Sequence, residues 1–205
     1  MIRNLVLDMG NVLIRFDPDG IMNRLGVTDP QDRLLLKHEV FSTVEWAATD
    51  RGSLTEETAY PRMASRLPER LHSVLRDILF HWNEPMVPVE GMEEYARECK
   101  KLGLKVFVLS NVSARGHEYM PHLPAADIMD GMVLSGDLLL VKPQPEIYLY
   151  FTSRFGLRPE ECLFVDDNCV NVEGCVQCGW NGIVFHGDMA ELRRKTREMG
   201  IPVQA

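Results

Sequence analysis

The sequence predicts an α/β protein in which helices cover a parallel sheet and a block of helices interrupts the chain. Short apolar runs without polar alternation, such as Leu5 to Leu7, are typical of strands buried on both faces. From about residue 88 these runs alternate with helical segments, which implies right-handed crossovers. Residues 17–88 contain no convincing strand. We therefore predict a core of residues 1–16 and 89–205 with an inserted α-helical cap of residues 17–88.

The individual elements follow from apolar periodicity and from helix start and stop signals. Asp29 before Pro30 is typical of a helix start, and Gly103 and Gly156 of helix ends. A hairpin is expected around Gly136. The expected strands are 5–7, 104–109, 132–134, 162–165 and 183–185. The expected helices are 18–25, 30–41, 43–49, 55–66 and 70–82 in the inserted block, and 89–102, 113–120, 144–155, 169–178 and 188–198 in the core.

Composition narrows the class of protein. The chain has 205 residues, 45% of them hydrophobic, so it can bury a sizeable core, and no segment approaches the length of a membrane span. The net charge of −8 and the scattered Lys and Arg residues disfavour a nucleic-acid partner. The N-terminus lacks a signal-peptide pattern, and the number of cysteines is odd, with four of the 5 between residues 162 and 178. We expect reduced thiols and a cytoplasmic location, and the oligomeric state is left open.

Polar side chains stand at the ends of three predicted strands. Asp8 ends the first apolar run, Ser110 and Asn111 end the second, and Asp166 and Asp167 follow a later one. Because the carboxyl ends of parallel strands face one crevice, these side chains are expected to meet there. A carboxylate at the edge of an apolar core needs a partner, and metal coordination or nucleophilic chemistry would supply one.

Lys142 completes this set. Pro143 and Pro145 hold it on a stiff, extended entry to a helix. A carboxylate nucleophile, a hydroxyl, a fixed cation and a carboxylate pair are the groups needed for phosphoryl transfer through an aspartyl-phosphate, assisted by magnesium. Magnesium takes oxygen ligands and one or two carboxylates, here Asp8 and one of the acidic pair. Lys142 and Ser110 would hold phosphate oxygens.

These four motifs resemble those of the haloacid dehalogenase (HAD) superfamily of hydrolases. The resemblance is strongest to its helical-cap phosphatases, near the glucose-1-phosphate phosphatases and the phosphatase domain of soluble epoxide hydrolase. It covers the whole chain and implies a Rossmann-like core, a Mg2+ cofactor and a small-molecule phosphate ester as substrate. Carried over to this sequence, it implies the nucleophile Asp8, a magnesium-binding backbone carbonyl at Gly10, phosphate contacts at Ser110, Asn111 and Lys142, and the metal ligand Asp167 with Asp166 behind it.

Two positions depart from the family pattern. Gly10 stands where family phosphatases usually carry a second aspartate that acts as general acid and base. Such catalysis is typically worth about 10²–10⁴-fold, so we expect a preference for better leaving groups, such as a sugar 1-phosphate, with water or a cap residue replacing the acid. Asn171 stands where many relatives keep a further acid, which implies a less negative metal site.

Two other stretches invite a functional reading. In the predicted cap, Trp46, Asp50 and Arg51 lie where relatives place a substrate-facing loop. Arg51 would contact a second anionic group of the substrate, although a solvated surface arginine is an equal reading. The pair Cys175 and Cys178 is interpreted as a helix end packed on the sheet, since no second Cys or His pair is near to complete a zinc site.

The preferred interpretation is a magnesium-dependent phosphatase that hydrolyses a small phosphorylated metabolite. One alternative is a 2-haloacid dehalogenase, in which the same aspartate attacks carbon. That chemistry needs no magnesium and usually lacks the acidic pair, so Asp166 and Asp167 disfavour it. Another alternative is a catalytically weakened protein that binds a phosphorylated metabolite, supported only by Gly10 and Asn171.

Overall fold

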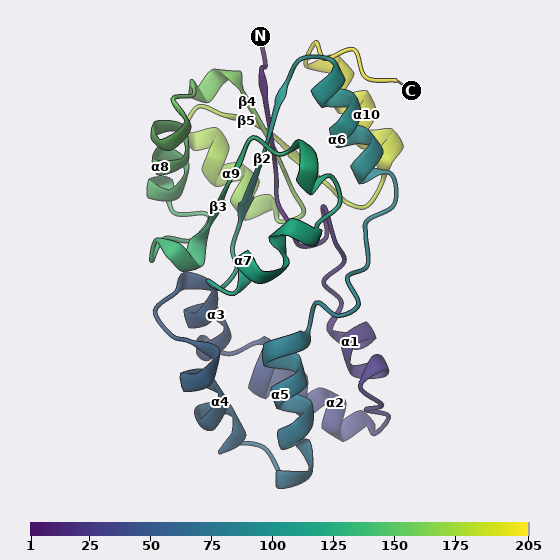
Figure 1. Cartoon of the computed structure of the whole chain (residues 1–205), viewed down its shortest axis with the longest axis vertical. Helices are drawn as coiled ribbons and strands as arrows, with labels where there is room; N and C mark the ends of the chain where they lie inside the picture. The colour runs from purple at the N-terminus through teal and green to yellow at the C-terminus, as the bar shows by residue number, and fades with distance from the viewer. Residues whose placement is uncertain (205) are drawn as a thin grey trace.

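The computed structural model, which describes residues 1–204, contains a five-stranded parallel sheet (Figure 1). Its strand order is β3-β2-β1-β4-β5. The strands are β1 (Asn4–Leu7), β2 (Lys105–Ser110), β3 (Gly131–Leu134), β4 (Cys162–Asp166) and β5 (Asn181–Val184). Leu7 pairs with Val108 on one side and with Val165 on the other, so β2 and β4 extend only two residues and one residue beyond the end of β1. The α/β class predicted from the sequence is confirmed.

Helices cover both faces of this sheet. The helices α6 (Met92–Lys101) and α10 (Met189–Glu198) lie on one face, and α8 (Pro145–Phe155) and α9 (Cys169–Gln177) on the other (Figure 1). Along β1, Leu5 and Leu7 join the apolar cluster under α6 and α10, whereas Val6 joins the cluster under α8 and α9. Burial on both faces explains why the strands read as unbroken apolar runs. Cys175 is part of the second cluster, as expected for a core cysteine.

A separate set of helices follows β1 in the chain and lies beyond the carboxyl ends of the strands (Figure 1). These helices, which we call the helical layer, are α1 (Pro18–Arg24), α2 (Pro30–Leu36), α3 (Val44–Arg51), α4 (Glu56–Ala64) and α5 (His72–His81). They enclose their own apolar cluster around Leu36, Met63 and Leu75. Asp29 and Thr43 cap α2 and α3 with their side chains, as their residue types favour. The domain limits drawn from the sequence stay a prediction.

Trp82 lies where the helical layer meets the sheet. Its ring packs against the apolar clusters of both parts. The ring centroid is 5.2 Å from that of Phe16, which precedes the helical layer, and 5.8 Å from that of Tyr119 in α7 (Gly116–Tyr119). Both pairs are edge-to-face, the arrangement that the charge distribution of aromatic rings favours.

Several predicted elements differ in detail from those observed. The helix expected from residue 89 begins at Met92, because Gly91 before it has a φ of +80°. No hairpin forms around Gly136; β3 is followed by a 3-10 turn, Ser135–Asp137, and pairs in parallel with β2. The helix expected over 30–41 continues after Leu36 as a π-helix, Lys37–Phe41. The last strand begins at Asn181, two residues early, because its pairing with β4 starts there.

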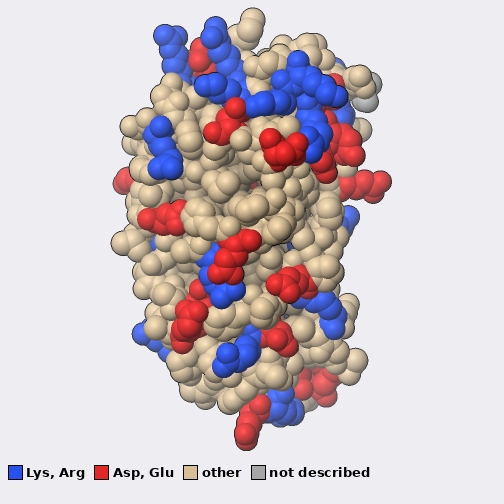
Figure 2. Space-filling model, in the orientation of Figure 1, with Lys and Arg blue, Asp and Glu red and all other residues tan. Residues whose placement is uncertain are grey.

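Charged groups are mixed over the surface seen in Figure 2, with Lys and Arg gathered at the end that holds α6 and α10. Acidic side chains accompany them: Arg193 lies 2.5 Å from Glu98, and Lys100 lies 2.5 Å from Asp130.

Among residues 1–204, every helix is too short or too polar to cross a bilayer.

One narrow contact joins the helical layer to the sheet. Gly52 has a φ of +82°, and a Cβ atom added to it would lie 2.0 Å from the carbonyl oxygen of Gly136. On either side of this contact, the Ser135 hydroxyl donates a hydrogen bond to the Asp50 carbonyl oxygen, and Arg51 Nε donates to the Leu139 carbonyl oxygen over 3.0 Å. We call the contact of residues 50–52 with residues 135–139 the seam. Only glycine at position 52 permits this approach.

Because of the seam, Gly52→Ala should destabilise the fold more than the left-handed backbone conformation of Gly52 alone would predict. Alanine at a left-handed position costs about 1–2 kcal/mol, and forcing a methyl group into a packed contact adds about 1–3 kcal/mol. Gly26→Ala is a matched control, because Gly26 has a φ of +73° but open space around it. Urea denaturation is expected to show a larger loss of unfolding free energy for Gly52→Ala than for Gly26→Ala. Equal losses would contradict the close packing of the seam.

Candidate active site

A cavity of about 230 Å³ lies between the carboxyl ends of β1, β2 and β4 and the helical layer. The sheet side of its wall includes Asp8, Gly10, Asn11, Ser110, Asn111, Ser113, Lys142, Asp167 and Asn171. The helical layer and its connections contribute Phe16, Trp46, Thr49, Asp50, Glu56, Leu79 and Trp82. A wider cleft of about 930 Å³ shares Asn11 and Asp167 with it, but Asp8 and Lys142 are not among the residues that line that cleft. We take the smaller cavity as the candidate active site.

The buried ammonium group of Lys142 holds this site together. Its Nζ atom lies 2.7 Å from Asp8 Oδ1, 2.7 Å from Asp166 Oδ2 and 3.0 Å from the carbonyl oxygen of Leu109. These acceptors belong to three adjacent strands and their ends. Since an ammonium group has three protons, each acceptor takes one. The lysine therefore ties the proposed nucleophile to the first residue of the acidic pair.

Side chains from neighbouring loops fix both partners of this cluster. Asn111 donates from Nδ2 to the Lys142 carbonyl oxygen over 2.9 Å and accepts from the Lys142 backbone N–H over 2.8 Å. Asp166 accepts hydrogen bonds from the Asn168 backbone N–H over 2.8 Å and from Asn171 Nδ2 over 3.1 Å. The phosphate contact that the family resemblance implies at Asn111 stays a prediction; the side chain of Asn111 holds the lysine backbone with both its oxygen and its nitrogen. Asn171 likewise holds Asp166.

Burial and the neighbouring charges shift the pKa values of Asp8 and Lys142. Burial raises the pKa of Asp8 to about 6, against the charge of Lys142, and the charge of Asp166 adds to this rise. Burial also disfavours the Lys142 ammonium, but the charges of Asp8 and Asp166 outweigh it and raise the pKa of the lysine. At neutral pH Asp8 is therefore mainly a carboxylate and Lys142 an ammonium group.

Three carboxylates here can hold a metal ion. Oxygen atoms of Asp8, Asp166 and Asp167 lie within 4.8 Å of one another. With all three ionised and Lys142 charged, the cluster carries two net negative charges. Hard oxygen donors and a net charge of this size fit Mg2+, which prefers carboxylate oxygens and retains water. Asn11 orients Asp167 by donating from Nδ2 to its Oδ2 atom over 3.0 Å.

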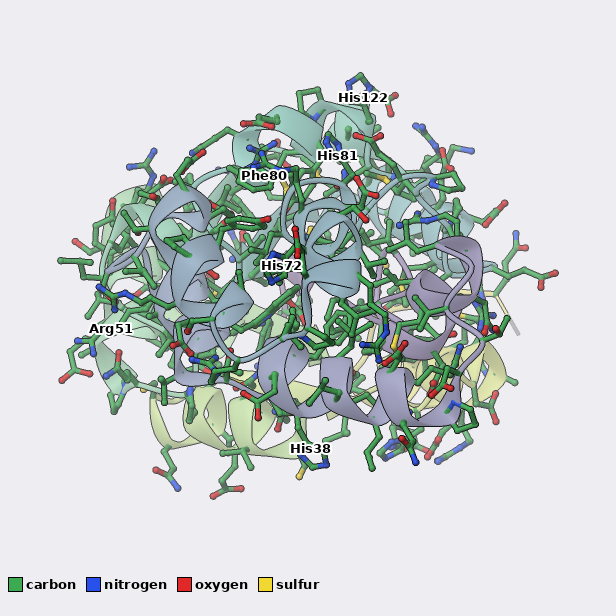
Figure 3. All side chains as sticks on the ribbon, turned by 90° about the horizontal axis from the view of Figure 1, so that it is seen from below. His38, Arg51, His72, Phe80, His81 and His122 are labelled. Atoms are coloured by element: carbon green, nitrogen blue, oxygen red, sulfur yellow. The ribbon has the colours of Figure 1, made fainter. Side chains whose placement is uncertain are left out.

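The structure does not bring every predicted site residue to the cavity. Ser110 lines it, is buried, and makes no side-chain hydrogen bond within residues 1–204, so its hydroxyl is available to a ligand. Gly10 also lines it. Arg51, by contrast, is exposed and bonded to the Leu139 carbonyl oxygen, and Figure 3 shows it at the periphery of the molecule. Its neighbour Asp50 lines the cavity instead.

Sequence reasoning missed several residues of the cavity. Asn11 was not assigned a role, although an asparagine directly after the glycine of the first motif is a residue type that tolerates its φ of +54°. Glu56 and Ser113 were also missed: Ser113 Oγ donates to Glu56 Oε1 over 2.5 Å and joins the helical layer to the loop after β2. No pattern in the sequence links these two residues, which are far apart in the chain.

Removing the lysine should destabilise the fold strongly. Lys142→Met would leave two buried carboxylates without a cation, and breaking a buried ion pair in this way typically costs about 3–5 kcal/mol. Lys105→Met removes an exposed lysine at the start of β2 and is expected to change stability by less than about 0.5 kcal/mol. Urea denaturation at neutral pH would measure both. A loss below about 1 kcal/mol for Lys142→Met would contradict the role of the cluster.

Magnesium should stabilise the folded chain through Asp167. A ligand present at about 100 times its dissociation constant adds about 2.7 kcal/mol, which corresponds to a rise in melting temperature of about 5–10 °C for a chain of this size. Asp167→Asn is expected to lose most of this rise. Glu173→Gln, an exposed change on the following helix, should keep it. The same rise in wild type and Asp167→Asn would exclude Asp167 as a ligand.

The chain is similar in sequence to several known proteins. The chain is 27% identical over 210 residues to drimenol cyclase drtB of Aspergillus calidoustus, a match that covers 100% of this chain and 38% of that protein. It is 27% identical over 186 residues to D-ribitol-5-phosphate phosphatase of Bacteroides thetaiotaomicron, which covers 84% of this chain and 86% of that protein. The chain spans between a quarter and two fifths of the length of the first curated relatives that it matches.

The fold also matches solved structures. A crystal structure of a HAD family enzyme from Bacteroides thetaiotaomicron, an aspartate-to-alanine mutant in complex with magnesium and inorganic phosphate, aligns with a TM-score of 0.70. The two sequences are 19% identical, and the match covers 94% of this chain and 99% of that one. Residues 2–179 match the protein family described as haloacid dehalogenase-like hydrolase. The chain therefore belongs to the haloacid dehalogenase-like hydrolases.

Proposed function

We propose that this protein is a magnesium-dependent phosphatase that hydrolyses a small phosphorylated metabolite through an aspartyl-phosphate on Asp8. One observation carries the proposal: a carboxylate nucleophile, a buried lysine, a free serine hydroxyl and a carboxylate pair line or support one cavity. Each group has a task in phosphoryl transfer, where catalysis consists mainly of positioning and charge stabilisation.

In the proposed mechanism Asp8 is the attacking group. Its second oxygen is held by Lys142, which keeps the carboxylate ionised and fixes its direction. The Ser110 hydroxyl would donate to a phosphate oxygen, and Asp166 would keep the lysine in place. Asp8, the Gly10 carbonyl and Asp167 would hold the metal, which supplies positive charge against the phosphate and the nucleophile when bound.

The cavity favours a compact leaving group with hydroxyls. Its volume of about 230 Å³ is below the range of about 300–1,000 Å³ that is typical of sites for drug-sized ligands. Aromatic rings of Trp46 and Trp82 and polar groups of Thr49 and Glu56 lie on its helical side. A sugar phosphate suits this mixture. The relative named D-ribitol-5-phosphate phosphatase acts, by its name, on D-ribitol 5-phosphate.

Among sugar phosphates we favour a 1-phosphate. Gly10 leaves the proton donor to another residue of the cavity, and an anomeric oxygen depends less on that donor because it leaves more easily than a primary alcohol. The helical layer, residues 17–88 in the limits drawn from the sequence, would act as a cap that closes over the ester and excludes water. Arg51 would have no part in binding, since it does not line the cavity and its Nε atom donates to the Leu139 carbonyl oxygen.

Two other functions have less support. A haloacid dehalogenase has no use for three clustered carboxylates, because Lys142 offsets only one of their charges and the remaining ones repel one another without a metal ion. A protein that only binds a phosphorylated metabolite would not need an ionised nucleophile held at 2.7 Å by a buried lysine. It would bind phosphate esters in the presence of magnesium without releasing phosphate.

Phosphate release from p-nitrophenyl phosphate, glucose 1-phosphate, glucose 6-phosphate and ribitol 5-phosphate tests the proposal. Turnover is expected with magnesium and not with a chelator. Asp8→Asn should lower it by about 10⁴–10⁶-fold, as loss of a nucleophile does in other enzymes. Asp127→Asn, an exposed change, should leave it unaltered.

The outcomes separate the parts of the proposal. Faster release from glucose 1-phosphate than from glucose 6-phosphate would support the leaving-group argument, and equal rates would overturn that argument alone. No release from any ester by the wild-type protein would favour the binding protein.

A further inference from the structure

The proposed phosphatase reaction needs a proton donor for the leaving group, and Gly10 cannot supply one. Within residues 1–204, the carboxyl groups that line the cavity are those of Asp8, Asp50, Glu56 and Asp167. Asp8 is the nucleophile and Asp167 a metal ligand in the proposed function, on which this inference rests. We propose that Asp50, at the end of α3, is the catalytic acid that protonates the leaving oxygen and later the base that activates water.

Asp50 is placed on the correct side of the cavity for this task. It comes from the helical layer, whereas Asp8 comes from the end of β1, so a phosphate ester held by Asp8 would direct its leaving group toward the helical layer. An in-line displacement puts the leaving oxygen opposite the attacking carboxylate. A donor must therefore stand across the cavity from the nucleophile, as Asp50 does.

The backbone of Asp50 is held rigidly. Its carbonyl oxygen accepts a hydrogen bond from the Ser135 hydroxyl, which lies in the turn after β3. Ser135 Oγ in turn accepts from the Val112 backbone N–H over 2.9 Å, close to the phosphate-binding Ser110. The glycine contact of the seam follows two residues later at Gly52. These contacts fix Asp50 relative to the loop that is expected to bind phosphate.

The surroundings of Asp50 keep its carboxyl group protonated. Burial raises the pKa of Asp50 to about 8, the charges of Glu56 and Asp8 add to the rise, and a hydrogen bond with the Trp46 side chain acts against it. Burial raises the pKa of Tyr119 in α7, and the negative charge that Asp50 carries when it is ionised adds to this rise. At neutral pH most of the Asp50 carboxyl groups carry the proton that a general acid must give.

Glu56 is less suited to the role. Its Oε1 atom is already engaged, because it accepts a short hydrogen bond of 2.5 Å from Ser113 Oγ. Its position suits contact with substrate hydroxyls.

The two steps balance in atoms and protons. In the first, Asp8 attacks phosphorus, the bond from phosphorus to the leaving oxygen breaks, and that oxygen takes the proton of Asp50. In the second, the Asp50 carboxylate takes a proton from water, the resulting hydroxide attacks phosphorus, and Asp8 is released as a carboxylate. Inorganic phosphate leaves, and Asp50 is again protonated.

Two aryl phosphates of nearly equal shape test this role in the magnesium-loaded enzyme. Phenyl phosphate has a poor leaving group that needs a proton, whereas p-nitrophenyl phosphate has a good one, and neither carries hydroxyls that Asp50 could bind. Asp50→Asn is expected to lower kcat/KM for phenyl phosphate by about 10²–10⁴-fold and for p-nitrophenyl phosphate by less than about 10-fold. Glu57→Gln, on an exposed residue of α4, should change neither.

The pH dependence gives a second readout. With wild type, kcat/KM for phenyl phosphate should fall as the pH rises through about 8, because the deprotonated acid cannot donate, and this fall should be absent in Asp50→Asn. Binding of inorganic phosphate and magnesium by the variant, measured by calorimetry, should stay within about twofold of wild type and show that the site is folded.

Equal losses on the two aryl phosphates, or no loss on either, would overturn the assignment of Asp50 while leaving the phosphatase proposal intact. A wild-type protein that releases phosphate from neither ester would overturn the proposed function and this assignment with it.

Discussion

The buried ammonium of Lys142 is the interaction on which the rest of the site depends. A charge without solvent needs partners of opposite sign, and here the ends of β1 and β4 supply one carboxylate each, with a carbonyl oxygen of β2 as the third acceptor. This arrangement requires β1 to lie between β2 and β4 with their carboxyl ends within two residues of one another, as the register shows. The ion cluster can therefore form only with this strand order, and the cluster in turn stabilises that order.

The cluster also explains why the side chains of two asparagines in the cavity wall are already engaged in hydrogen bonds. Asn111 and Asn171, which resemble ligand-binding residues in the sequence, hold Lys142 and Asp166 respectively. A buried ion cluster stabilises a protein only when its remaining donors and acceptors are satisfied. Polar groups that support the charges leave Ser110 and one side of Asp8 for the ligand.

Much of the fold could be predicted because each buried strand is a short apolar run that ends at a polar residue. The positions of Asp8, Ser110 and Asp167 at one cavity follow from that pattern and from the geometry of parallel sheets, whereas Lys142, which precedes α8, was included for its proline neighbours and its charge. The helical side of the cavity could not be derived in the same way. Neighbouring residues on a helix point in directions about 100° apart. The sequence does not show which side of this helix faces the cavity, so it could not decide between Arg51 and Asp50.

The contacts across the seam could not be predicted from the sequence either, because they join segments more than 80 residues apart through glycines and backbone oxygens. The close approach of Gly52 to Gly136 depends on the absence of a side chain, and the sequence does not indicate which distant segment will fill that space. The expected hairpin at Gly136 failed for a related reason. Its glycine serves the tertiary contact with the helical layer rather than a turn between paired strands.

The position of Trp82 gives the molecule an intrinsic optical reporter. Its indole borders the cavity and packs on the apolar clusters of both the sheet and the helical layer, and Trp46 lies on the same wall. The third tryptophan, Trp180, is buried under α8 and α9 on the opposite face of the sheet. Indole fluorescence depends on the polarity around the ring. Ligand binding in the cavity should therefore change the emission of Trp46 and Trp82 and leave that of Trp180 unchanged.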